Sequence, residues 1–251
     1  IAITVEGSNT LTRSLIIFGQ GLNRSHPYLL DIIKTIQNKN ELDKFHIYLI
    51  KIINHTIINL SNSLYYSIST KIKSNKNKIE FYEENLNRLV SNFAFSTNIA
   101  LLMGGKIKTS EYISGRYADM LTNIYMAYAC LWYYEKNKNV KNIDKLLEAS
   151  INEHFINIQN AINDISYNFP IPLCGNIIKY CTFPFGLDYH KHNDILTSDI
   201  SDLITKSSEI RDLLTENIYI SSNKNDRLNQ IMRGIELENK CNMINKSIAI
   251  S

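Results

Sequence analysis

Residues 111–135 read EYISGRYADMLTNIYMAYACLWYYE, and their apolar positions recur at steps of three and four. The members of this stripe are Ile113, Tyr117, Met120, Leu121, Ile124, Tyr128 and Leu131. This spacing places the side chains on one face of an α-helix, where they can be buried against other helices. The stretch therefore predicts a long amphipathic helix within a helical protein.

The segments on either side show the same periodicity. Residues that break helices are scarce, with 4 Pro and 9 Gly among 251 residues, and they fall between the periodic segments. We expect helices over about 11–18, 27–37, 41–72, 79–103, 143–167, 173–180, 199–205, 209–215 and 226–245. Long helices joined by short polar connections are typical of a helical bundle. The predicted fold class is all-α, with residues 3–5 as a short β-like lead before the first helix.

Composition excludes several classes of protein. Hydrophobic residues make up 44% of the chain and charged residues 20%, which is enough apolar material for a sizeable core. The net charge is only +3 and the Lys residues are scattered, so we expect no nucleic-acid partner. The four Cys have no CxxC spacing and suit a reducing compartment. The chain shows no signal-peptide pattern, and its most apolar stretch, 49–60, is too polar to span a bilayer. We therefore expect a cytoplasmic location.

The opening of the chain places Glu6 and Gly7 before a predicted helix. In one interpretation Glu6 is an exposed carboxylate favoured by the helix dipole, and Ser8 or one of the next two residues caps the helix. In the other, Gly7 lets a flat ligand approach the backbone and Glu6 acts as a general base. The helix N-terminus would then donate hydrogen bonds to an anionic cofactor. Spacing alone favours the first interpretation.

The wider sequence context changes this balance. The segment VEGSNTLTR at 5–13 resembles the Glu-Gly-Thr region near the C-terminal end of acyl-CoA dehydrogenases. The similarity is closest to the long bacterial fatty acyl-CoA dehydrogenases, which carry an extra helical C-terminal domain. It is carried by residues 3–30, 101–135, 168–186 and 207–220, which are spread along most of the chain.

The resemblance implies a specific chemistry for the opening residues. Glu6 matches the catalytic base of that family, which removes a proton from the carbon alpha to the thioester of a fatty acyl-CoA. A hydride passes from the beta carbon to N5 of FAD, giving a trans-2-enoyl-CoA, and the electrons then pass to an electron-transfer acceptor. Gly7 matches the glycine that lets flavin and thioester come close. Ser8 stands where Thr is more frequent, and its hydroxyl would contact the cofactor or cap the helix. For Arg13 we expect a structural salt bridge rather than a substrate contact.

The same resemblance suggests a domain division. Residues 1–24 would form the C-terminal end of the dehydrogenase catalytic domain, and residues 25–251 the appended helical domain. The upstream domains that bind FAD and CoA are absent from the sequence, so we expect a fragment of a β-oxidation enzyme that is inactive when isolated. An alternative stays open, in which the chain is a non-catalytic helical module. It would then support homo-oligomer assembly or peripheral contact with the inner membrane.

Three further groups of residues invite a chemical interpretation. The segment DYHKHND at 188–194 could be drawn as a metal site, but its spacing matches no metal class, so we predict no metal. Arg116 and Asp119 lie one helical turn apart and predict an ion pair. His55 and His154 lie in apolar helical stretches and are expected to be hydrogen-bonded core residues rather than ligands.

Overall fold

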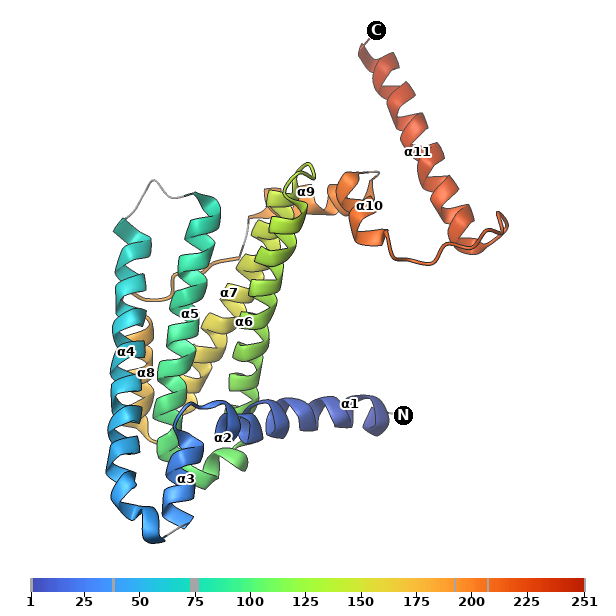
Figure 1. Ribbon diagram of the computed structural model, residues 1–251. Helices are drawn as coiled ribbons and strands as arrows, with labels where there is room; N and C mark the ends of the chain where they lie inside the picture. The colour runs from blue at the N-terminus through green and yellow to red at the C-terminus, as the bar shows by residue number, and fades with distance from the viewer. Residues whose placement is uncertain (1, 38, 73–76, 192, 207, 251) are drawn as a thin grey trace. The chain divides into compact units, whose positions relative to one another are not determined.

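The computed structural model describes residues 2–37, 39–72, 77–191, 193–206 and 208–250. In order, the elements are α1 (Ala2–Leu11), η1 (Thr12–Gln20), α2 (Gly21–Ser25), α3 (Leu29–Gln37), η2 (Lys39–Lys44), α4 (Phe45–Ile72), α5 (Lys78–Ala100), η3 (Leu101–Lys108), α6 (Glu111–Asn137), α7 (Ile143–Asn168), α8 (Pro172–Thr182), α9 (Asp194–Thr205), α10 (Glu209–Thr215) and α11 (Arg227–Ile250). Every regular element in these ranges is helical, and the all-α prediction is confirmed (Figure 1).

The start of the chain corrects two predictions. Residues 3–5 belong to α1, so the β-like lead is wrong. A run of three residues is too short to set strand conformation, and each of these residue types costs a helix only a few tenths of a kcal/mol. The helix also does not stop at Gly19 and Gly21, because η1 is a π-helix that continues directly into α2. Gly21 has helical angles of φ −59° and ψ −41°.

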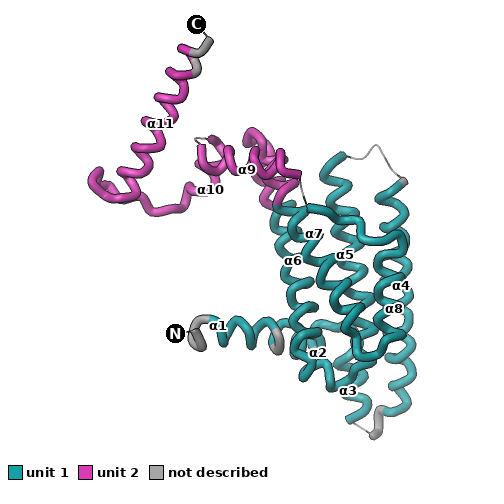
Figure 2. Tube along the Cα trace, turned by 180° about the vertical axis from the view of Figure 1, so that it is seen from behind, with its two compact units in different colours: residues 1–131, 150–191 teal, residues 132–149, 192–251 magenta. Residues whose placement is uncertain are grey.

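The chain forms two compact units, which Figure 2 shows in different colours. Unit 1 comprises residues 1–131 and 150–191, and unit 2 comprises residues 132–149 and 192–251. In unit 1, α4 packs along α5, and α8 packs against both. The largest fully buried side chains of unit 1 are Arg88, Tyr117, Phe155, Leu86, Leu89, Met120, Ile151, Ile158, Ile162, Ile165 and Ile178. These side chains form the core that joins α5, α6, α7 and α8.

The stripe that predicted α6 is largely confirmed. Ile113, Tyr117, Met120 and Ile124 are buried and face the core of unit 1. The Tyr117 hydroxyl donates a hydrogen bond to the backbone oxygen of Ser96 on α5, at 2.8 Å. The exposed side chains of the stripe are Leu121 and Tyr128. The apolar face of α6 is therefore wider than the part that the neighbouring helices cover.

Helix α8 lies unusually close to the end of α7. A Cβ atom placed on Gly175 would lie 2.2 Å from the backbone oxygen of Ser166, so only glycine fits this crossing. The C-terminal end of α8 is held by side chains of other helices. Ser63 of α4 donates to the Cys181 oxygen at 3.4 Å, and Arg88 of α5 donates to the Thr182 oxygen at 3.3 Å. The cationic Arg88 thereby lies at the helix end that favours positive charge.

Unit 2 is built around the end of α6 and the start of α7. Lys145 of α7 forms an ion pair with Asp199 of α9 at 2.6 Å. The carboxylate of Glu209 in α10 accepts a hydrogen bond from the backbone N–H of Lys141 at 3.0 Å. The buried side chain of Ile210 belongs to the apolar part of this unit. These contacts attach the short helices α9 and α10 to the connection between α6 and α7.

Candidate functional site

The residues predicted to carry the chemistry lie in the middle of α1. Glu6, Gly7 and Ser8 are all exposed, as are residues 9–13. Because α1 begins at Ala2, these residues are neither N-caps nor at the N-terminus of a helix. The expected helix start after Gly7 and the expected cap at Ser8 are therefore wrong, whereas the role of Glu6 as a base stays a prediction. An exposed position in the helix interior neither buries Glu6 nor offers free backbone N–H groups beside it.

Arg13 fixes the end of this segment to α6. Its Nε and Nη2 atoms donate to the two carboxylate oxygens of Asp119 at 2.6 and 2.5 Å, a bidentate pair. This hydrogen-bonded contact raises the pKa of Arg13. Gly115 leaves room for the guanidinium, since a Cβ there would lie 2.6 Å from the Arg13 Nη1. The predicted salt bridge of Arg13 is confirmed.

The same contact corrects another prediction. Asp119 was expected to pair with Arg116 on its own helix, but its carboxylate is engaged by Arg13. Within the described ranges, no ion pair joins Arg116 to Asp119. Pairs along one helix are weak, about 0.2–0.5 kcal/mol, so a bidentate partner from another element displaces them. Sequence spacing alone could not reveal that partner, because it lies far away in the chain.

Aromatic stacking anchors the N-terminal segment more firmly. The ring of Phe18 stacks on the ring of Tyr117 at a centroid distance of 4.4 Å and an angle of 10°. Phe93 meets both rings edge-on, at 6.3 Å from Phe18 and 6.2 Å from Tyr117. Burial raises the pKa of Tyr117. The tyrosine therefore remains a neutral hydrogen-bond donor at the base of this cluster.

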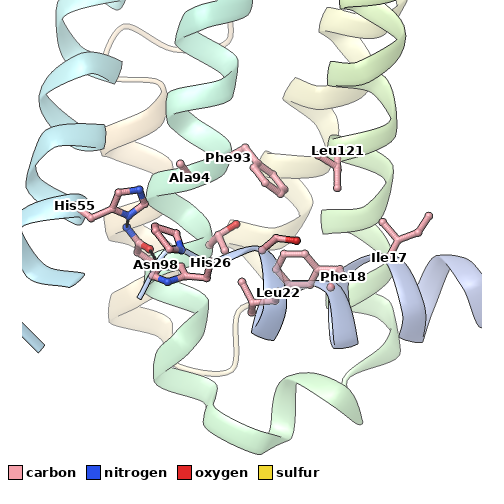
Figure 3. Close-up of a pocket in the computed structure, with 13 residues that line it drawn as sticks. Ile17, Phe18, Leu22, His26, His55, Phe93, Ala94, Asn98 and Leu121 are labelled. Atoms are coloured by element: carbon pink, nitrogen blue, oxygen red, sulfur yellow. Dashed lines mark hydrogen bonds between the residues drawn. The ribbon is translucent and has the colours of Figure 1, made fainter. Parts of the chain in front are cut away.

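Beside the aromatic cluster lies a cavity of about 360 Å³ between the N-terminal segment and α4, α5 and α6. Its apolar side chains include Phe18, Leu22, Phe93 and Leu121. Its polar side chains include His26, His55, Thr97 and Asn98. Figure 3 shows the two histidines and Asn98 on one side, with Phe18, Phe93 and Leu121 across from them. We call this space the His55 cavity.

A chain of hydrogen bonds runs along the polar side of the His55 cavity. The backbone N–H of Tyr28 donates to His26 Nδ1 at 3.2 Å. His26 Nε2 contacts Asn98 Oδ1 at 2.9 Å, and Asn98 Nδ2 contacts His55 Nδ1 at 3.0 Å. Burial lowers the pKa of His26 by more than the hydrogen bond with Asn98 raises it. His55 is hydrogen-bonded as predicted, but it is only half-buried and is not a core residue.

His154 is also hydrogen-bonded as predicted, since its Nδ1 contacts Asn123 Oδ1 at 2.9 Å. His26 and Asn98, in contrast, were missed by sequence reasoning. Only weak features of the sequence could have indicated these two residues. Asn98 is a polar residue on the buried face of a predicted helix, and His26 directly precedes Pro27. A buried amide must find partners, but the sequence does not identify which ones.

The segment 188–194 has a structural role. The carboxylate of Asp188 pairs with Arg88 at 2.8 Å and with Lys71 at 3.1 Å. Although burial alone would raise the pKa of Asp188, its hydrogen bonds to Arg88 and Lys71 lower it. In the described part of the chain, no three His, Cys, Asp or Glu residues are grouped so as to hold a metal ion. His192, which the metal hypothesis included, lies outside the described residues.

Comparison with known proteins identifies the family. Residues 23–250 match the family model for the bacterial-type C-terminal region of acyl-CoA dehydrogenase. The match covers most of the chain, so the protein belongs to this family, as its sequence predicted. No solved structure matches the chain. Among the helices that the structure describes, none combines the length and apolarity needed to cross a membrane.

The family implies FAD, so we asked whether the opening residues could hold it. Glu6, Gly7 and Ser8 lie on an exposed helix, and the backbone there is committed to helical hydrogen bonds. A flavin site must enclose a planar ring system and keep water away from it. The described residues around Glu6 do not form such an enclosure. This part of the chain therefore does not fit FAD by itself.

Proposed function

We propose that this chain is the C-terminal part of an FAD-dependent acyl-CoA dehydrogenase that converts fatty acyl-CoA to trans-2-enoyl-CoA in fatty acid β-oxidation. The observation that carries this proposal is the family match over residues 23–250. An all-α chain with buried stripes and cross-helix contacts is consistent with an appended helical domain. The reaction needs an electron-transfer acceptor, and in this proposal FAD is bound mainly by domains other than the helical domain described here.

In this proposal Glu6 is the base that accepts the alpha proton of the thioester. Its exposed position leaves the carboxylate free to be covered by flavin-binding domains, which would exclude water from it and position it against the substrate. Gly7 and Ser8 would contact the cofactor from the same segment. The division into residues 1–24 and 25–251 remains a prediction, as does a cytoplasmic location with peripheral contact at the inner membrane.

The test uses a polypeptide that contains the flavin-binding domains together with this chain. Glu6→Gln should lower turnover of a fatty acyl-CoA by about 10²- to 10⁴-fold, the range typical of general base catalysis. The flavin absorbance spectrum should stay unchanged. Glu236→Gln is the matched control, because Glu236 is an exposed carboxylate on α11. Unchanged turnover in Glu6→Gln would remove Glu6 from the mechanism.

A second role is favoured by the outer face of α4. The positions 47, 50, 54, 57, 61, 64 and 68 follow each other at steps of three and four. The large apolar members of this row, Ile47, Ile50, Ile57, Leu64 and Ile68, are all exposed. A heptad row of this kind, with Asn54 as one polar member, is the pattern that pairs helices in coiled coils. We therefore propose that α4 also pairs with α4 of a second copy, which makes the domain an assembly module.

Light scattering after size-exclusion chromatography tests the assembly role. The chain should elute as a dimer, and Ile57→Lys should convert it to a monomer because a charge cannot be buried unpaired in the seam. Leu102→Lys is the control, since Leu102 is exposed on η3 outside the row. A monomeric wild-type chain, or a dimer that survives Ile57→Lys, would contradict this role.

A further inference from the structure

We propose that the His55 cavity is a binding site for an uncharged molecule with a medium-length apolar chain and one carbonyl oxygen, to which the His55 imidazole donates a hydrogen bond. The proposal does not depend on Glu6 acting as a base. It rests on four properties of the cavity, which are its size, the direction of its hydrogen bonds, an unpartnered hydroxyl and its lack of charge.

The size sets the length of the ligand. A cavity of about 150 Å³ in another protein holds benzene, so the 360 Å³ of the His55 cavity would hold roughly 12–14 non-hydrogen atoms. This volume lies at the lower end of the range for small-molecule sites. The apolar walls contributed by Phe18, Phe93 and Leu121 suit an alkyl chain. A short acyl ketone, aldehyde or ester has the required size and polarity.

The direction of the hydrogen bonds follows from one backbone group. A backbone N–H can only donate, so the bond from Tyr28 requires an unprotonated Nδ1 on His26. Neutral His26 then carries its proton on Nε2 and donates to Asn98 Oδ1. The Asn98 amide nitrogen in turn donates to Nδ1 of His55. Neutral His55 therefore carries its proton on Nε2.

This arrangement leaves one donor for a ligand. Within the described residues, His55 Nε2 has no hydrogen-bond partner, while its Nδ1 is fully engaged by Asn98. Because His55 lines the cavity, its Nε2–H can donate a hydrogen bond to the carbonyl oxygen of a ligand. Three preceding hydrogen bonds hold its tautomer, and the imidazole cannot switch to acceptor without breaking them. The site therefore selects an acceptor over a donor.

Thr97 gives independent evidence that the cavity is built for a polar group. Its Oγ1 is a buried side-chain atom without a hydrogen-bond partner, and Thr97 lines the same cavity. Buried hydroxyls in folded proteins are nearly always paired, and an unpaired one calls for an explanation. Threonine in a helix has two accessible χ1 rotamers. If the Thr97 side chain rotates about χ1 toward the cavity, its hydroxyl can form a hydrogen bond with an oxygen of the ligand.

The cavity is also uncharged, which decides the class of ligand. No Lys, Arg, Asp or Glu occurs among the described residues that line it. Burial holds the pKa of His26 below its usual value, so His26 does not supply a positive charge near neutral pH. A carboxylate would have to be buried without a counter-ion, which is very costly. The site therefore favours a carbonyl compound over the fatty acid of the same length.

The experiment titrates undecan-2-one into the chain labelled with ¹⁵N-histidine and records imidazole NMR spectra. The spectra of the free chain should show both His26 and His55 with the proton on Nε2. The ketone should bind saturably and shift the His55 Nε2–H resonance. Decanoate at pH 7.5 should bind at least tenfold more weakly. Saturable binding of both compounds with equal affinity, or no binding of the ketone, would overturn the proposal.

Variants separate the site from unspecific apolar binding. His55→Phe keeps a ring but removes the donor, and should weaken ketone binding about 3- to 10-fold, as expected for one hydrogen bond. Leu121→Trp places a larger ring at a partly exposed wall position and should abolish binding. Met126→Trp is the matched control on the same helix, because Met126 is similarly exposed and does not line the cavity. Binding that survives Leu121→Trp would refute the assignment.

Discussion

The close crossing of α8 over α7 gives the sharpest prediction for stability. In Gly175→Ala the new Cβ would lie 2.2 Å from the Ser166 backbone oxygen and 3.3 Å from the Phe169 Cβ. Ordinary contact distances require the two helices to separate by about 1 Å. Interiors are packed too densely to absorb such a shift freely, and overpacking costs about 1–3 kcal/mol.

The displacement also loosens the hydrogen bonds at the end of α8. The last carbonyl oxygens of α8 accept hydrogen bonds from Ser63, Arg88 and Asn92 over distances of 3.3–3.4 Å. These bonds are already long, so a further displacement of α8 would break them. Each such bond contributes about 0.5–1.5 kcal/mol. The higher helix propensity of Ala returns about 0.5–1 kcal/mol. We therefore expect a net loss of about 2–4 kcal/mol, which lowers the melting temperature by about 5–15 °C.

Differential scanning calorimetry and urea unfolding, followed by circular dichroism, measure this loss. The control is Gly234→Ala in α11, where an added Cβ meets no atom within 4 Å. That variant should unfold at the same temperature as the wild type or slightly above it, because Ala favours a helix interior. A Gly175→Ala protein as stable as the wild type would refute the argument that this crossing is closed to a side chain.

The remaining predictions concern ion pairs. Arg88→Ala should destabilise the chain by about 3–5 kcal/mol in urea unfolding, because it leaves the Asp188 carboxylate half-buried beside Lys71 alone; a loss below about 1 kcal/mol would contradict this. The lowered pKa of Asp188 contributes stability that is present above the unfolded-state pKa and lost as pH falls through the folded value. The stability difference between wild type and Asp188→Asn, measured from pH 7 to pH 3, should therefore be largest above about pH 5 and shrink below about pH 4; a constant difference would exclude the carboxylate as its source. Gly115→Ala should displace the flexible Arg13 side chain and cost about 1 kcal/mol or less, since that ion pair is exposed; calorimetry should show a small shift that Arg13→Ala reproduces.

The sequence predicted the positions of the helices better than it predicted which side chains contact each other. Periodicity located α6 and its buried residues Ile113 and Tyr117, because a helix face repeats locally whatever lies opposite. It could not distinguish the covered from the open part of a stripe, so Leu121 was expected to be buried and is exposed. It also favoured an Arg116–Asp119 pair, since sequence spacing reveals only partners that are close along the chain. The true partner, Arg13, lies 106 residues away.

The candidate site shows the same limit. The resemblance directed attention to Glu6, but the conformation of α1 depends on what surrounds it, and neighbouring domains are not visible in local spacing. The His55 cavity combines residues from four separate stretches of the chain, which lie at 17–27, 55, 93–98 and 121. No short sequence motif connects these stretches. The family match supports the role of the whole chain, whereas the cavity depends on how the helices pack and cannot be recognised from the sequence.

The way in which α8 ends has a consequence for the order of folding. Its terminal carbonyl oxygens are held by α4 and α5, across sequence separations of 118, 94 and 90 residues. The α4–α5 pair, in contrast, is a hairpin of neighbouring helices and needs only a short loop to close. Because long loops close at a higher entropic cost and more slowly, the hairpin should assemble first and α8 should dock on it late. The first step in unfolding would then be the departure of α8, which exposes the buried guanidinium of Arg88 to water before the long helices separate.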